Sequence, residues 1–197
     1  ANATAVNEQR FAPNIKNVVS TDAQGDILGS NVGEFIKLLP GVSGEYSGVE
    51  MIGISVRGLG SGLTSFTSNG APMVSAFFVG GVAGGGRDFN INTMAMNDVS
   101  RVEVTKVPTP SSPADSLAGS VNMVSKSAFE RSSPELRLGL SLASSSGNLT
   151  FKKTPHSNGD HPTRKTLAGF DFDYTLPVTK NFGLVLAGMQ SNRFNEQ

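Results

Sequence analysis

Two histidines are the residues whose type and spacing come closest to a metal site. His156 and His161 lie five positions apart with Asp160 between them, and imidazole with carboxylate is a donor set that divalent metals accept. Their surroundings favour a polar loop, because Asn158-Gly159 and two nearby prolines interrupt any regular element. We therefore expect neither a metal site nor a cofactor.

Paired acids and glycine-rich segments are the other features with chemical potential. Asp171 and Asp173 project to one side of a strand, as paired carboxylates would, although acids that line the lumen of a β-barrel explain them more simply. Residues 57–62 (RGLGSG) and 84–86 (GGG) could cradle a phosphate, but neither leads into a convincing helix and no GK[ST] follows. Since no serine, histidine and aspartate set has a local nucleophile context, we expect no enzyme.

The composition argues against a nucleic-acid-binding protein. Sixteen basic and sixteen acidic residues leave no formal net charge, and no cluster of lysine and arginine marks a phosphate-binding surface. The absence of cysteine excludes disulfides and thiolate metal sites. Twenty-three glycines and no tryptophan indicate a turn-rich chain dominated by strands. No apolar run reaches the length of about 18 residues that marks a membrane-spanning helix.

One segment before Pro134 has a convincing helical pattern. In residues 31–42 (NVGEFIKLLPGV) the apolar side chains that share one face are Val32, Phe35, Ile36 and Leu39. Asn31 can cap this helix while Glu34 reaches back to it, and Pro40-Gly41 ends it. The sequence therefore predicts a short helix that buries one stripe.

Short strands account for the rest of this part of the chain. They are expected at residues 16–20, 52–57, 76–79 and 101–106, separated by glycine, serine and asparagine. In the last of them Val102 and Val104 alternate with polar residues, so one side of that strand should be buried.

After Pro134 the pattern changes to strands with a strict alternation of apolar and polar residues. Three are predicted, at residues 135–143, 169–176 and 181–187. A long polar segment, residues 144–166, joins the first two, whereas only residues 177–180 join the second and third. Alternating long and short connections are typical of outer-membrane β-barrels, whose apolar face meets lipid. Three strands of an ordinary antiparallel sheet are the alternative.

Four segments in order carry a resemblance to a known family. The stretch VEVTKVP, a small-residue tract and AGSVNMVSK end at Lys126, and they resemble the end of the plug domain of TonB-dependent outer-membrane receptors, RIEVxKGP leading to GGxxNxxTK. NVGEFIKLLPGV is similar to the family's NVxExLxxLPGV helix, ISVRGLG (residues 54–60) to its IxxRG strand, and FFVGGVA (residues 77–83) lies where receptors carry VxVDG. The resemblance covers residues 17–126.

The sequence departs from this pattern at three places. Val107 stands where the family usually has glycine, Asp115-Ser116-Leu117 replace a tyrosine-glycine pair, and Gly80 replaces the aspartate of VDG. We expect these departures to change the loop conformation and the ligand contacts more than the fold.

The resemblance implies an α+β plug domain followed by the start of an antiparallel transmembrane β-barrel that is incomplete in this chain. Residues 1–16 would be an N-terminal periplasmic segment, residues 17–132 the plug and residues 133–197 the first three barrel strands. Because three strands cannot close a barrel, the other strands would come from the rest of the chain or from a second polypeptide. A TonB-contacting box would lie upstream of Ala1.

The implied function is active import of a nutrient across the bacterial outer membrane. The plug would gate the barrel lumen and be accessible from the periplasm, and the expected partners are the TonB energy transducer, outer-membrane lipid and an imported siderophore, carbohydrate or similar large ligand. A non-transporting surface or secreted β-rich binding or adhesion domain is the alternative.

The resemblance also implies roles for individual residues. Arg57 and Lys106 match basic positions that help to lock the plug against acids of the barrel wall; exposed strand-end charges are the alternative. Four residues of plug loops are candidates for ligand contact: Phe66, Arg87, Asp88 and Phe89. For the two phenylalanines, anchors of the core are the alternative.

Overall fold

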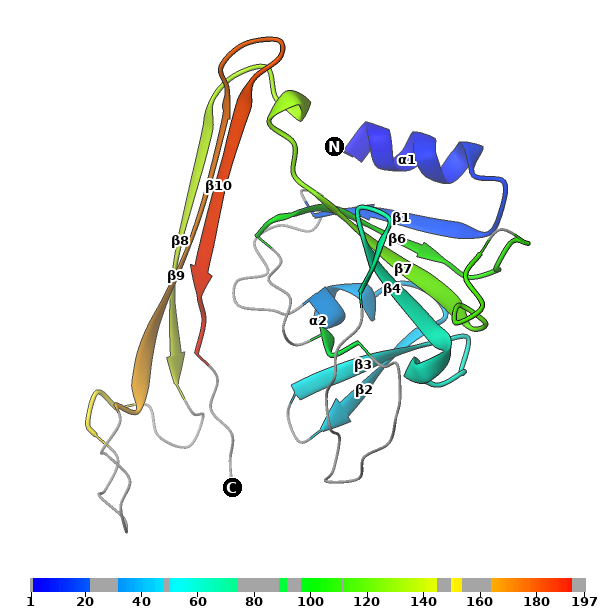
Figure 1. The fold of residues 1–197 in the computed structure, drawn as a ribbon. Coiled ribbons are helices and arrows are strands. Elements are labelled where there is room, and N and C mark those ends of the chain that lie inside the picture. The colour runs from blue at the N-terminus through cyan, green and yellow to red at the C-terminus, as the bar shows by residue number, and fades with distance from the viewer. Residues whose placement is uncertain are drawn as a thin grey trace.

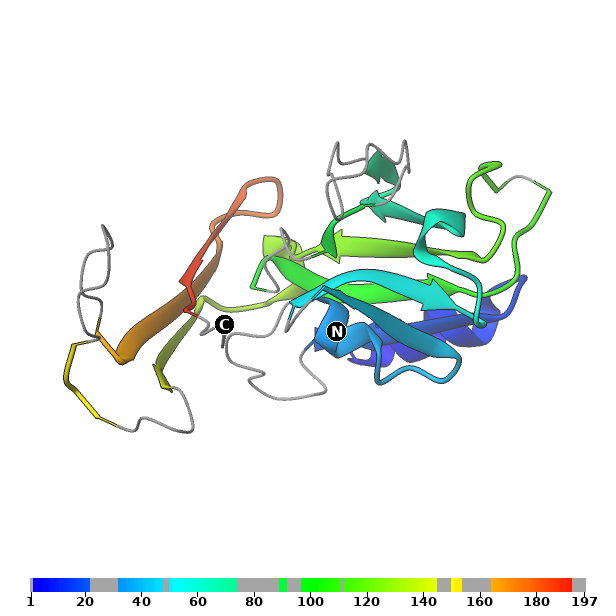
Figure 2. The same ribbon diagram turned by 90° about the horizontal axis from the view of Figure 1, so that it is seen from below.

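A computed structural model of the chain describes residues 2–21, 32–47, 50–73, 89–91, 97–110, 112–144, 150–153 and 164–192. These residues form a mixed α and β unit and, beside it, three long strands (Figure 1). In the view turned by 90°, the long strands stand to one side of the mixed unit (Figure 2). Among the residues that the structure describes, no helix is long and apolar enough to cross a membrane.

A five-stranded sheet in the order β1-β6-β7-β4-β5 organises the mixed unit. Its strands are β1 (Lys16–Ser20), β4 (Thr64–Ser68), β5 (Ala71–Met73), β6 (Val99–Thr105) and β7 (Gly119–Ser125). All neighbours are antiparallel except β4 and β7. Asn69 and Gly70 close the β4–β5 hairpin at φ of 50° and 81°, the left-handed pair that a tight type I′ turn requires. The expected strand at residues 16–20 is confirmed.

The inner face of this sheet carries the hydrophobic core. Helix α2 (Val32–Ile36) and the hairpin of β2 (Val42–Ser47) and β3 (Glu50–Val56) complete it. The core residues of α2 and the strands are all apolar and include Phe35, Ile36, Met51, Ile54, Val102, Val104, Val121 and Met123. Helix α2 is shorter than the 31–42 pattern predicts, because Leu38 and Leu39 bond three residues back instead of four as the chain approaches Pro40. The predicted apolar face is nevertheless buried; Asn31 and the expected strand at 76–79 lie outside the described residues.

The outer face of the five-stranded sheet is covered by a helix that the sequence does not predict. Helix α1 (Asn2–Phe11) runs alongside β1 (Figure 1), although the sequence shows no helical pattern there. Ala5 of this helix is buried, and Gln9 Oε1 accepts a hydrogen bond from Val18 N at 3.1 Å. Because α1 and polar neighbours cover this side, Glu103 is buried as well as Val102 and Val104. The expected burial of the Val102 and Val104 side of the 101–106 strand is therefore confirmed, and Glu103 on the other side is buried in addition.

The three long strands form a second sheet in the order β10-β9-β8. They are β8 (Glu135–Ser144), β9 (Thr166–Pro177) and β10 (Gly183–Gln190), all antiparallel. The apolar side chains of β8 point into solvent, and Leu140 is 85% exposed. Asp173 and Thr175 of β9 lie on the opposite face and are buried. This sheet thus turns its polar side toward the mixed unit.

Candidate functional site

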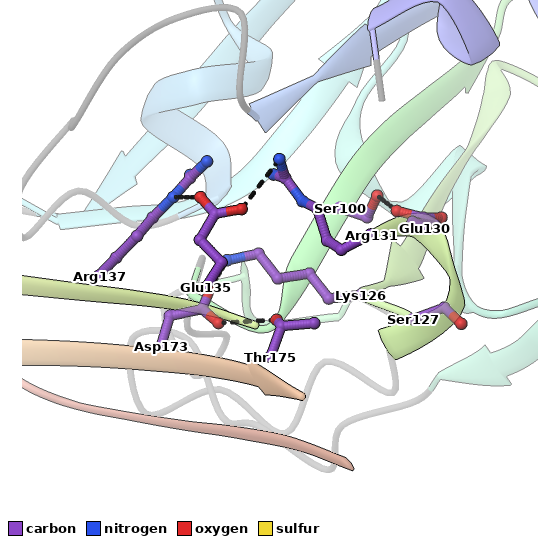
Figure 3. A pocket seen from close by; sticks show the side chains of 9 residues that line it. All are labelled: Ser100, Lys126, Ser127, Glu130, Arg131, Glu135, Arg137, Asp173 and Thr175. Carbon is purple, nitrogen blue, oxygen red and sulfur yellow. Dashed lines mark hydrogen bonds and ion pairs between the residues drawn. The ribbon is translucent and has the colours of Figure 1, made fainter. Parts of the chain in front are cut away.

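The two parts of the chain meet at a small polar cavity of about 20 Å³ (Figure 3). Nine polar or charged side chains line it, from β6, from the segment after β7 that contains the short helix η4 (Ala128–Glu130), and from β8 and β9. This volume holds about one water molecule. The cavity is therefore a packed ionic junction and not a site for a small-molecule substrate.

An ion pair between Lys126 and Asp173 joins the two sheets directly. Lys126 follows β7, and its backbone N–H donates to Asp98 O at 2.9 Å. Asp173 projects from the polar face of β9, where Thr175 Oγ1 lies 3.5 Å from its Oδ1. The side chains of Lys126 and Asp173 are only 17% and 11% exposed. At such a site each charge depends on its partner, because a buried charge without one is strongly destabilising.

A second group of charges fixes the start of β8. Glu135 accepts from Arg137 Nε at 2.7 Å and from Arg131 Nη1 at 3.0 Å. In Figure 3 the two arginines reach the same carboxylate from opposite sides. Nearby, Ser100 Oγ of β6 donates to Glu130 Oε2 at 2.8 Å. The chain therefore enters the second sheet through a segment that is tied to both sheets.

On the outer face of the first sheet, Glu103 is the centre of a charged network. Lys16 Nζ lies 2.6 Å from its Oε2, and Arg101 Nε lies 3.0 Å from its Oε1. Asn122 Nδ2 donates to Oε2 at 3.3 Å. Burial alone raises the pKa of Glu103, but hydrogen bonds from Lys16 and Asn122, with the charge of Lys16, outweigh this effect. The pKa of Glu103 is thus held below its ordinary value, and the carboxylate is charged at neutral pH.

The structure brings the two predicted lock residues together. Arg57 Nη1 donates to Lys106 O at 3.2 Å, and the side chain of Arg57 is exposed. Arg57 has a φ of 58°, which is rare for a residue other than glycine, and its N–H donates to Gly41 O at 2.8 Å. Among the described residues neither Arg57 nor Lys106 has an ion-pair partner. In the described part of the chain, neither cationic group therefore has a carboxylate within ion-pair distance.

The candidate ligand contacts are placed differently. Phe66 and Phe89 are 3% and 6% exposed, and their ring centroids lie 5.4 Å apart inside the core. In this conformation neither ring can touch a ligand, because the surrounding core covers both. Arg87 and Asp88 lie outside the described residues, as do His156 and His161. Within the described ranges no three histidine, cysteine, aspartate or glutamate side chains gather as a metal site would need.

The sequence reasoning did not pair Lys126 with Asp173, although both carried a signal. Lys126 ends the SVNMVSK segment, and Asp173 was expected on the polar face of a barrel strand. The expected partners of the barrel-wall acids were Arg57 and Lys106, and not Lys126. Their contact could not be predicted from local sequence, because Lys126 and Asp173 are 47 positions apart and lie at different sheets.

Comparison with known proteins gives a family and a fold. The TonB-dependent Receptor Plug Domain model matches residues 8–121, more than half of the chain. No curated protein sequence matches. The structure is similar to ferric citrate transporter FecA in the unliganded form, with a TM-score of 0.64 at 13% identity over 95% of this chain and 27% of that one.

Two further solved structures are similar over most of this chain. A mutant of the ferric enterobactin receptor PfeA from Pseudomonas aeruginosa in complex with enterobactin has a TM-score of 0.56 at 19% identity, covering 90% of this chain and 24% of that one. The siderophore receptor PirA from Acinetobacter baumannii has a TM-score of 0.58 at 16% identity, covering 88% and 24%. The chain spans about a quarter of the length of the three proteins. It therefore belongs to the TonB-dependent receptor plug domain family, with the fold of an α+β plug followed by the start of an antiparallel β-barrel.

Proposed function

We propose that this chain is the gating part of an outer-membrane receptor that actively imports a nutrient. The observation that carries the proposal is the two-sided sheet β8–β10. Its apolar face is exposed along β8, and its polar face meets the plug through Asp173. A sheet with lipid on one side and a plugged lumen on the other requires this arrangement. Residues 1–16 would then be the N-terminal periplasmic segment, residues 17–132 the plug and residues 133–197 the first three barrel strands.

The plug acts in this proposal as a two-state element. A ligand outside and a partner inside can shift it only through their different affinities for the closed and the remodelled plug. The Lys126–Asp173 pair favours the closed state because it joins the plug to β9. Arg57 and Lys106 form a second lock, at which their charges face acids of the barrel wall. Charge reversal, Arg57→Glu, should lower the resistance of the plug to urea and alter uptake. Unchanged resistance and uptake would remove Arg57 from the proposal.

TonB is the proposed source of force, acting from the periplasm on the N-terminal segment. The ligand class stays open between siderophore and carbohydrate. The similar receptors are named for ferric enterobactin and ferric citrate, which makes iron chelates the first class to test. At 13–19% identity, however, those proteins support the fold and not the ligand. Arg87 and Asp88 remain the proposed ligand contacts of the plug loops.

Uptake measurements in cells with and without the gene test the proposal. Growth at limiting iron on defined siderophores, and then on different glycans, identifies the ligand class. The proposal expects uptake of one ligand to disappear without the gene and in a strain that lacks TonB. The protein should also fractionate with the outer membrane and migrate as a heat-modifiable barrel. A soluble, monodisperse product would contradict import and favour a surface or secreted binding domain.

A further inference from the structure

One guanidinium touches three carboxylates from three different elements. Arg101, in β6, directs Nη2 to Glu8 of α1 at 3.2 Å and Nε to Glu103 of its own strand at 3.0 Å. Its Nη1 lies 3.9 Å from Glu130 of η4. Each nitrogen of the planar group therefore reaches a different acid. A lysine could not do this, because its ammonium is a single compact charge on a flexible stem.

The three contacts of Arg101 differ in length and in how exposed the acid is. Glu103 is the best-fixed acid, since its side chain is 7% exposed and is also held by Lys16. Glu8 is more exposed, at 38%, so water screens its pair with Arg101. The contact with Glu130 is the longest of the three and depends most on how the guanidinium is oriented.

Removal of α1 would leave equal numbers of positive and negative groups around Arg101. Lys16 and Arg101 face the carboxylates of Glu8, Glu103 and Glu130, two positive groups against three negative ones. Without Glu8 the count is two against two, so α1 can leave without stranding a charge in this network. The guanidinium would then turn toward Glu103, because a two-nitrogen fork on one carboxylate is its preferred geometry.

From this arrangement we propose that Arg101 is a positioning residue that couples α1 to the plug–barrel junction. While Glu8 holds Nη2, the opposite nitrogen Nη1 is aimed at Glu130. When α1 detaches, the guanidinium closes on Glu103 and leaves Glu130, which loosens η4 beside the Lys126–Asp173 pair. Under the proposed import function, a pull on the N-terminal segment would reach the junction by this route. The coupling between α1 and η4 does not depend on whether the protein imports a nutrient.

Amide hydrogen exchange of η4 in the purified intact protein tests the coupling. The amides of Phe129 and Glu130, which donate to Ser127 Oγ and Ser127 O at 3.3 and 3.1 Å, are the reporters. Glu8→Gln should raise their exchange rate about threefold or more, although Glu8 does not touch η4. In an Arg101→Lys background the same change should have no further effect. Arg10→Gln, on the same helix but outside the network, is the matched control and should leave η4 unchanged.

Two results would overturn the coupling. One is slower or unchanged exchange of η4 in Glu8→Gln, which is expected if loss of Glu8 only removes its repulsion of Glu130. The other is an equal increase in the parent and in the Arg101→Lys background, which would mean that α1 acts on η4 by another path. A Glu130→Gln background gives a second check that leaves the guanidinium intact, and there too Glu8→Gln should have no added effect. The measurement needs neither TonB nor ligand, so its failure would leave the import proposal standing, and failed uptake would leave the coupling standing.

Discussion

The two sheets of this chain use the same alternation of apolar and polar residues for opposite purposes. The plug sheet buries its apolar face against α2 and the β2–β3 hairpin, and its polar face carries the Glu103 network. The sheet β8–β10 exposes its apolar face and turns its polar face to the plug. A period of two therefore fixes which residues share a face, but only the surroundings decide which face is covered.

This contrast predicts that loss of a core side chain will affect the plug most. Phe35→Ala removes a fully packed ring from α2 and should lower the free energy of unfolding of the plug by about 3 to 5 kcal/mol. Leu38→Ala, three residues along and exposed, is the control and should change it by about 0.5 kcal/mol or less. Urea-dependent protease resistance measures both. Equal effects of the two changes would mean that the described core is wrong.

On the sheet β8–β10 an exposed apolar residue should tolerate another apolar side chain but not a charge. Leu140→Arg should cost about 2 to 4 kcal/mol for folding into lipid vesicles if Leu140 lies near the bilayer midplane. Leu140→Phe keeps the position apolar and should fold as the parent does. Urea titration of vesicle-inserted protein gives the difference. An arginine that is accepted without loss would place this face in water.

The ion pair that joins the two sheets should have an intermediate effect. A double-mutant cycle with Lys126→Met and Asp173→Asn should give a coupling energy of about 1 to 3 kcal/mol, because both side chains are mostly buried. Asp171→Asn is the control. Asp171 lies on the same face of β9 as Asp173, but it forms no ion pair with the described residues. Combined with Lys126→Met, it should show additive effects on plug unfolding in urea. If the effects of Lys126→Met and Asp173→Asn were also additive, Lys126 and Asp173 would not interact at the junction.

A substitution on the polar face of the plug sheet should change the free energy of unfolding least, and the size of that change should depend on pH. The pKa of Glu103 is lowered from its ordinary value of 4.5. Its ionised form therefore contributes stability that is complete above that value and is lost as pH falls through the lower folded-state pKa. Glu103→Gln should reduce stability at neutral pH by about 1 to 2 kcal/mol, and the gap from the parent should narrow below about pH 4. Urea unfolding at neutral pH and below about pH 4 measures this difference in stability between Glu103→Gln and the parent. A difference that is the same at both pH values would mean that Glu103 is unpaired.

The elements with local signals were predictable from the sequence. The alternation of Leu136, Leu138 and Leu140 placed β8, and the spacing of Val32, Phe35 and Ile36 placed the buried face of α2. Helix α1 was not predictable in this way, because its sequence NATAVNEQRF has little apolar periodicity and the helix is stabilised by what it contacts. Its partners, Arg101 and Val18, are brought to it only by the fold.

The candidate site was less predictable than the fold for the same reason. The motif positions Arg57 and Lys106 were found from their local sequence, and the structure brings them together at a strained turn. The contacts at the junction join residues from separate sheets, so no short motif encodes them. The burial of Phe66 could not be predicted from its neighbours in the sequence either, because the ring that packs against it, Phe89, is 23 positions along the chain.

The orientation of β8 in a bilayer decides whether its apolar face meets lipid, as a barrel wall requires. Because the chain has no cysteine, single cysteines can be placed at each position of residues 135–143 and spin-labelled in vesicles. Accessibility to oxygen should peak at Leu136, Leu138, Leu140 and Leu142. A water-soluble nickel chelate should not reach Leu138 and Leu140, in the middle of the strand. Loss of the two-residue alternation, or free access of the chelate to Leu138 and Leu140, would contradict a lipid-facing orientation of β8.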